Sequence, residues 1–244
     1  MATSLFLLLC LTISVGANHP EAIDLENTLP PLQVHPLPAS LAKIPISQNT
    51  SDYFDHISPT PLGYLVWSEF PIKVYLDRPP EPVDSSASSQ RFQQWTELVL
   101  QAIAEWNDYL PLKEVSDPIQ ADIVIQRTEP PLGTTVNPET GQIQIPRART
   151  AQTRYQFDLS QTSPPRITLR MTIQIKPGLS QTATLAAIRH ELGHALGIWG
   201  HSPDENDIMF YSQTKKTSPI SKRDINTLIK LYKQATRLGW PISS

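Results

Sequence analysis

The chain has 244 residues, of which 24 are Pro and only one is Cys. A single thiol excludes a disulfide framework and a zinc finger built on cysteines. The 20 basic and 23 acidic residues give a formal charge of −3, and no cluster of Lys and Arg stands out, so we expect no binding to nucleic acid or to an anionic membrane. The apolar content of 39% is enough for one sizeable core.

The first 17 residues have the pattern of an export signal. Residues 5–17 form a mostly apolar run that ends in Val15-Gly16-Ala17, and small residues suit a signal-peptidase site. The run is too short to anchor the chain in a bilayer. We therefore expect a signal peptide over 1–17 and a secreted or periplasmic protein without a membrane anchor. Because no Lys or Arg precedes the run, a buried N-terminal helix is the alternative.

Residues 18–62 contain eight of the prolines and show no helix or strand period. This composition favours an extended linker, a pro-segment or a strap over the surface of a domain. Sustained patterning begins at Gly63, so we expect the folded domain over 63–244. The lone Cys10 lies in the predicted signal, so cleavage after Ala17 would leave a mature protein without cysteine.

From Gly63 onward the sequence alternates between strand and helix patterns. Residues 70–76 alternate apolar and polar side chains as a strand does, and residues 92–106 place apolar side chains at the i, i+3 and i+4 positions of a long helix. Three further strands, a second helix and a closing helix are expected over 121–126, 142–145, 167–175, 181–196 and 221–236. This order predicts an α+β fold with helices packed on a mixed sheet.

The residues that carry chemistry lie between His190 and His201. His190-Glu191-Leu192-Gly193-His194 is an H-E-x-x-H sequence in a predicted helix, so both imidazoles lie on one helix face and can hold one metal ion. Imidazole suits zinc, and Glu191 beside the ion can act as general base toward water. Gly197 can end the helix and return His201 as a third ligand, which leaves a fourth position for water or substrate.

The segment from His190 to His201, followed by Met209, resembles the metzincin zinc peptidases and most of all their matrixin-like branch. The resemblance implies one catalytic Zn²⁺ on the three histidines, Glu191 as catalytic base, and Met209 as a structural floor beneath the metal. It also implies a polypeptide substrate that lies extended against an edge strand.

The same resemblance implies the architecture of residues 63–244. A twisted, mostly parallel sheet, a long first helix and the active-site helix would form an upper subdomain over 63–200. A small lower subdomain over 201–244 would end in a helix.

The motif departs from the family pattern in one place, because three residues rather than two separate Gly197 from the third histidine. Gly200 gives the longer loop a second permissive position, so we keep His201 as a ligand, with Asp204 or Asp207 as substitutes. These two and Glu205 form either part of a Ca²⁺ loop or a solvated turn.

Tyr211 stands two residues after Met209, where astacin-like metzincins place a tyrosine that stabilises the developing oxyanion. A tyrosine that packs or lies at the surface is the alternative. The sequence thus predicts a secreted zinc endopeptidase, taken as a monomer. The rivals are a non-catalytic zinc-bearing module that captures extended peptides and an exported domain without metal. Glu191 favours the enzyme, because a binding module needs no general base.

Overall fold

The computed structural model describes residues 29–45, 51–81, 84–132, 135–136, 143–144, 149–211 and 218–242. The signal peptide predicted over 1–17 lies outside these ranges. Among the helices within these ranges, none has both the length and the apolar character required to cross a bilayer.

The centre of the molecule is a five-stranded sheet in the order β3-β2-β4-β8-β7. Neighbouring strands are parallel except for β7, which runs antiparallel to β8 at one edge. The predicted α+β fold with a mostly parallel sheet is therefore confirmed. The strands span Leu112–Glu114 (β3), Ile72–Leu76 (β2), Ile123–Gln126 (β4), Ile167–Ile175 (β8) and Ala151–Leu159 (β7).

Strand β8 matches its sequence prediction, whereas β7 is not predicted by sequence periodicity. Every second residue of β8 is buried, as a half-buried strand requires. In β7 only Ala151 and Thr153 are buried, so its apolar alternation is weak. Its strand structure depends on pairing with β8 along its whole length, from Ala151 opposite Ile175 to Leu159 opposite Ile167.

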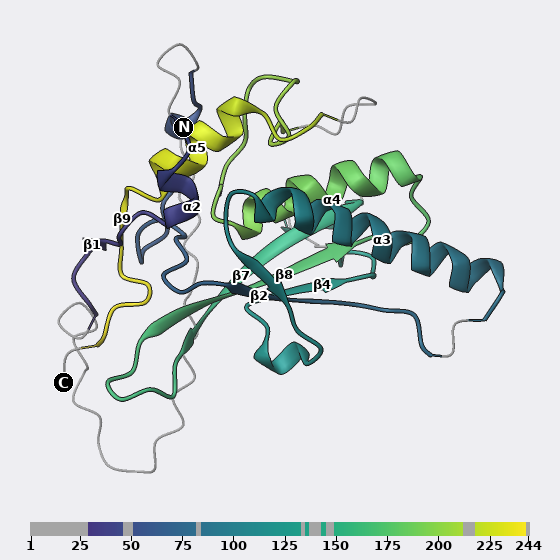
Figure 1. The fold of residues 1–244 in the computed structure, drawn as a ribbon, viewed down its shortest axis with the longest axis horizontal. Helices are drawn as coiled ribbons and strands as arrows, with labels where there is room; N and C mark the ends of the chain where they lie inside the picture. Colours follow the sequence, from purple (N-terminus) through teal and green to yellow (C-terminus); the bar gives the residue numbers. More distant parts are fainter. Residues whose placement is uncertain are drawn as a thin grey trace.

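Two long helices, α3 (Ala87–Asn107) and α4 (Gln181–Ala195), pack against each other, and α4 also packs on β7 and β8 (Figure 1). Each begins at a serine, Ser86 or Ser180, whose hydroxyl accepts a hydrogen bond from a backbone N–H of the first turn. The bounds of α4 agree closely with the predicted 181–196, whereas α3 begins five residues before the predicted 92 because the cap at Ser86 starts the helix earlier.

The last helix, α5 (Lys222–Leu231), begins with a capping box between Ser221 and Asp224. It ends five residues earlier than the predicted end at Thr236. The chain leaves the helix because Ala235–Thr236 (β9) pairs antiparallel with Gln33–Val34 (β1). The helix pattern in the sequence continues to 236. The strand that pairs with residues 235–236 lies about 200 residues earlier in the chain, so the local pattern could not indicate the end of the helix.

The described parts of the Pro-rich segment pack on the rest of the domain. Leu41, Tyr53, Ile57 and Leu62 are all buried in the core. The remaining short elements are α2 (Ala39–Ala42), two 3-10 turns, η1 (Phe54–His56) and η2 (Pro118–Gln120), and the pair β5 (Thr135–Val136) and β6 (Ile143–Gln144).

Candidate metal centre and active site

The three predicted histidines converge on one point. Their candidate ligand atoms all lie within 4.8 Å of one another, and they form the one such group of three His, Cys or acidic residues found in the described residues. His190 and His194 are on α4, and His201 follows the turn after that helix. Three imidazoles are the donor set that zinc prefers in a catalytic site with one open position, so the residues fit zinc.

The turn that returns His201 requires glycine at position 197. Gly197 has φ +112°, and a Cβ there would lie 2.2 Å from the carbonyl oxygen of Leu65. The last carbonyls of α4 are satisfied by two buried side chains: the Trp67 indole donates to the Ala195 oxygen at 2.9 Å, and the Tyr232 hydroxyl donates to the Leu196 oxygen at 3.1 Å. The end of the active-site helix is therefore fixed by the core.

Backbone carbonyls orient the two helical histidines. The Nδ1 atom of His190 lies 2.7 Å from the Ile208 oxygen, and that of His194 lies 2.7 Å from the Ile198 oxygen. A carbonyl can only accept, so each Nδ1 carries the proton and each Nε2 keeps a free lone pair for a metal. Burial lowers the pKa of His190 to about 4 and lowers the pKa of His194 as well. Both rings are therefore neutral at pH 7, as metal ligation requires.

The longer loop before His201 is accommodated by the N-terminal segment. Gly200 forms an antiparallel bridge with Ile57, and the backbone N–H of Ser58 donates to the Trp199 oxygen at 3.1 Å. A Cβ on Gly200 would lie 2.1 Å from the His56 oxygen, so only glycine permits this approach. Residues 56–58 thus pair with the segment that contains the additional residue.

Glu191 lies on the same helix as the first two histidines and is buried. Its Oε2 atom accepts a hydrogen bond of 2.6 Å from the hydroxyl of Thr153 on β7. Burial raises the pKa of Glu191 to about 7, although the Thr153 hydrogen bond and the charge of Arg149 oppose the increase. A carboxyl group with a pKa near neutrality can both take and give a proton at physiological pH.

Met209 is buried against the metal-binding helix α4, and its role as a structural floor beneath a metal stays a prediction. Its side chain is fully buried, and its backbone oxygen accepts from the Ser202 N–H at 2.8 Å. A Cβ on Gly193 would lie 2.3 Å from the Met209 sulfur, so glycine at this position lets the methionine pack directly on α4. The motif spacing alone gives no reason for Gly193.

The acidic residues after His201 form hydrogen bonds and do not join the metal cluster. Asp207 is buried and accepts from the hydroxyls of Ser202 at 2.5 Å and Ser221 at 2.6 Å. Asp204 accepts from both nitrogens of Asn206. Both aspartates also pair with Arg223, at 3.1 Å for Asp207 and 3.4 Å for Asp204. Glu205 is exposed and Asp204 is partly exposed, as in a solvated turn, whereas Asp207 is buried, and none of the described contacts supports a calcium site here.

Tyr211 is 70% exposed and its ring contacts Phe210. The alternative of a surface tyrosine fits this placement, and a role in transition-state stabilisation stays a prediction.

Sequence reasoning missed two residues that border the site. Thr153 contacts the catalytic-base candidate, and Tyr155 packs edge-on against Trp199 with ring centroids 4.9 Å apart. Both lie on β7, whose weak pattern gave no signal for a strand.

The fold and the site define a zinc metallopeptidase with a three-histidine metal centre. The Matrixin family model matches residues 83–233, which is more than half of the chain, and the chain therefore belongs to the matrixin family. No curated protein matches it.

Proposed function

We propose that the protein is an exported zinc endopeptidase in which Glu191 acts as the general base. The observation that carries this proposal is the placement of a buried carboxyl group on the same helix as two of three clustered histidines. A site that only bound peptides would not need a carboxyl group with a pKa near 7 next to the metal ligands. The apolar run over 5–17 supports export.

Three histidines would hold the ion. His190 and His194, on the helix, would bind it through their Nε2 atoms, and His201 would be the third ligand. Zinc bound there would polarise the scissile carbonyl and lower the pKa of water at the open position. Glu191 takes the proton of the attacking water and later passes it to the leaving amine. The Thr153 hydroxyl holds the Glu191 carboxylate in place for both transfers.

The edge strand β7 is the proposed docking edge for the substrate. It pairs with β8 on one side, and the described residues provide no partner for its other side. An extended peptide can add to such an edge through backbone hydrogen bonds. Because Thr153 contacts Glu191 and Tyr155 contacts Trp199, a peptide on this edge would lie next to the metal centre.

We also infer that residues 29–62 belong to the active catalytic domain. Tyr53 supports this inference, because its hydroxyl donates to the buried Asp224 at 2.6 Å and its backbone N–H donates to the Thr227 hydroxyl at 3.0 Å. Removal of the segment would expose apolar surface of the core and break the bridge between Ile57 and Gly200.

The test is cleavage of a mixed peptide library by purified residues 18–244, with and without a zinc chelator and with zinc added back. Glu191→Ala should keep zinc and lose about 10²–10⁴-fold in turnover, the range for loss of a general base. Equal loss of zinc and activity would contradict the role of Glu191. A folded, zinc-loaded protein that cuts nothing would instead support the peptide-binding module.

The metal ligands are tested by zinc content. His201→Ala should weaken zinc binding by about 100-fold or more, since loss of a group that only hydrogen-bonds to a metal ligand already costs about 10–100-fold. His56→Ala is the matched control, because His56 is exposed and lies outside the cluster.

A further inference from the structure

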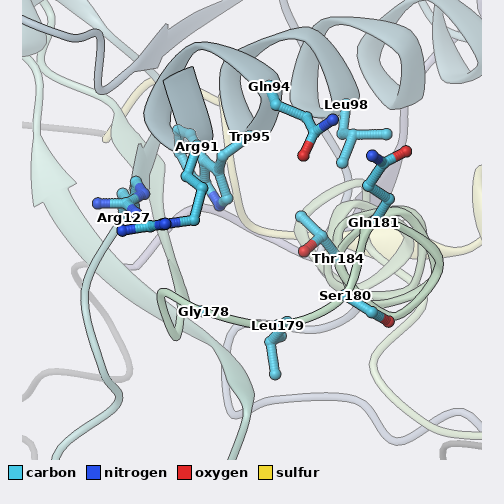
Figure 2. Close-up of a pocket in the computed structure, with 10 residues that line it drawn as sticks. All are labelled: Arg91, Gln94, Trp95, Leu98, Arg127, Gly178, Leu179, Ser180, Gln181 and Thr184. Carbon is cyan, nitrogen blue, oxygen red and sulfur yellow. The ribbon is translucent and has the colours of Figure 1, made fainter. Parts of the chain in front are cut away.

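A cavity of about 210 Å³ lies between the first half of α3 and the start of α4 (Figure 2). Its floor includes the Gly178–Ser180 connection after β8, and Arg127 follows directly after β4. The cavity therefore lies at the carboxyl ends of two adjacent parallel strands, where open α/β sheets generally bind ligands. It is separate from the metal centre, because the last α4 residue that lines it, Thr184, precedes His190 by six residues, or about 9 Å of helix rise.

The charged residues of the cavity are all positive. Arg91 and Arg127 line it, and their guanidinium groups lie together on one side (Figure 2). No acidic residue lines the cavity, and neither arginine forms an ion pair with any residue that the structure describes. The nearby Asp77 carboxylate accepts from the backbone N–H of Arg127 at 2.8 Å, and within the described residues it forms no ion pair with the Arg127 guanidinium group.

The arrangement of the two arginines carries an electrostatic cost. Burial lowers the pKa of Arg127, and the charge of Arg91 lowers it further, while Asp77 opposes both effects. The Arg127 guanidinium carbon also lies 4.7 Å above the Phe92 ring, which fixes the side chain beside the cavity. A bound negative charge would remove the cost of holding two like charges together.

A buried donor in the wall of the cavity has no acceptor. Trp95 is 4% exposed, lines the cavity, and its indole N–H has no hydrogen-bond partner (Figure 2). The Nε atom of Arg127 is also buried without a partner. Buried polar groups are almost always paired, so these two donors indicate a missing acceptor. The start of α4, a helix of 15 residues, adds the positive end of a helix dipole on the opposite wall.

We propose that this cavity is a binding site for an oxyanion, a carboxylate or phosphate group held by Arg91 and Arg127 against the N-terminus of α4. The guanidinium fork matches the oxygens of both groups, and the two arginines, the Trp95 indole N–H and the start of α4 all offer donors or positive charge. The group can come from a small free anion or from an acidic side chain of a polypeptide. Because α4 also carries His190, Glu191 and His194, an anion here stabilises the helix that bears the metal centre.

The experiment uses zinc-loaded residues 18–244 and measures the melting temperature against inorganic phosphate, with chloride at matched ionic strength. Phosphate should raise the melting temperature of the wild type by several degrees more than that of Arg91→Gln, because Arg91 is exposed and its loss leaves the fold intact. Non-specific stabilisation by phosphate and any contact with zinc act equally on both proteins. Lys233→Gln, an exposed lysine elsewhere, is the matched control for the lost charge and should respond like the wild type.

A second arm distinguishes the source of the anion. A short peptide that contains Glu should reduce the phosphate-dependent shift if an acidic side chain is the ligand, and the same peptide with Gln should not. If neither peptide competes while phosphate still separates wild type from Arg91→Gln, the ligand is a small free anion. Equal phosphate shifts in wild type, Arg91→Gln and Lys233→Gln would overturn the proposal. Arg127→Lys, which keeps the charge and loses the fork, should retain only part of the shift.

Discussion

The Thr153 hydroxyl on the edge strand and the Glu191 carboxylate on the active-site helix are joined by a 2.6 Å hydrogen bond. The same hydroxyl lies 3.0 Å from the backbone oxygen of Glu191. One side chain of the proposed substrate-binding strand therefore fixes the position of the proposed general base. This hydrogen bond joins β7 to α4, the helix that also carries two of the metal-ligand histidines.

Thr153→Val should lower kcat about 10-fold with little change in KM, because it removes the hydroxyl that orients Glu191 and preserves the side-chain shape. Thr153→Ser keeps the hydroxyl and should restore most of the rate. Steady-state kinetics on a peptide substrate would measure both constants. A rise in KM at constant kcat would show instead that Thr153 acts in substrate binding.

Gly200→Ala should weaken zinc binding about 10-fold and destabilise the fold by about 1–3 kcal/mol, because the added Cβ would collide with the His56 oxygen and displace the loop that carries His201. Zinc affinity would be measured by competition with a chelating dye, and stability by thermal unfolding. Gly178→Ala is the control: Gly178 has φ +85° but nothing within 4 Å of an added Cβ, so stability should fall and zinc affinity should not. Unchanged zinc affinity in Gly200→Ala would contradict the role assigned to residues 56–58.

Tyr53→Phe should lower the free energy of unfolding by about 2 kcal/mol, since it removes a hydrogen bond to a buried carboxylate. The other oxygen of Asp224 accepts from the backbone N–H groups of Ser221 at 2.7 Å and Ile208 at 3.1 Å, so the loss should also loosen the turn before Met209. Chemical denaturation would measure the change. Tyr64→Phe removes a hydroxyl without a hydrogen-bond partner in the described part of the chain and should be nearly neutral. Equal effects of the two variants would show that the segment does not depend on this contact.

Glu105→Gln should reduce the acid sensitivity of the fold. Glu105 and Arg189 form two contacts of 2.5 Å between α3 and α4. Burial would raise the pKa of Glu105, but the hydrogen bonds from Arg189 and Gln101 outweigh it and hold the pKa below its ordinary value of 4.5. A lowered folded-state pKa gives stability that is present above pH 4.5 and is lost as the pH falls through the folded value.

The wild type should therefore lose about 1 kcal/mol more than Glu105→Gln between about pH 5 and pH 3, a value discounted because the Glu105 side chain is 30% exposed. Unfolding by urea at several pH values would measure the difference. Glu97→Gln, at an exposed position of the same helix, should keep the slope of the wild type. A parallel pH dependence in all three proteins would exclude a contribution from this ion pair.

The local sequence was sufficient to predict the elements whose buried and exposed side chains follow a clear helix or strand period. The i, i+4 spacing of His190 and His194 and the turn at Gly197 follow from helix geometry and from glycine's freedom at positive φ. The same holds for β8 and for the start of α4, because the burial pattern of β8 and the serine cap of α4 are local properties, whereas α3 begins at Ala87, five residues before the expected start at 92. The zinc-binding residues could therefore be predicted before the fold was known.

The end of α5 and the strand β7 could not be predicted in this way. The helix gives way to β9 because of a partner at Gln33–Val34, and β7 is a strand because β8 is available to pair with it. Backbone pairing between distant segments leaves little trace in the side-chain pattern of an edge strand.

The sequence by itself determined the pair of helical histidines, the acidic residue between them and the α+β class, since these depend on spacing within one helix and on the order of strand and helix patterns along the chain. Only the tertiary structure decided what surrounds them: Thr153 on Glu191, residues 56–58 on Gly200, and the two arginines at the start of α4. Each of these contacts joins segments more than 30 residues apart. Their positions are set by the packing of sheet and helices, which no local periodicity encodes.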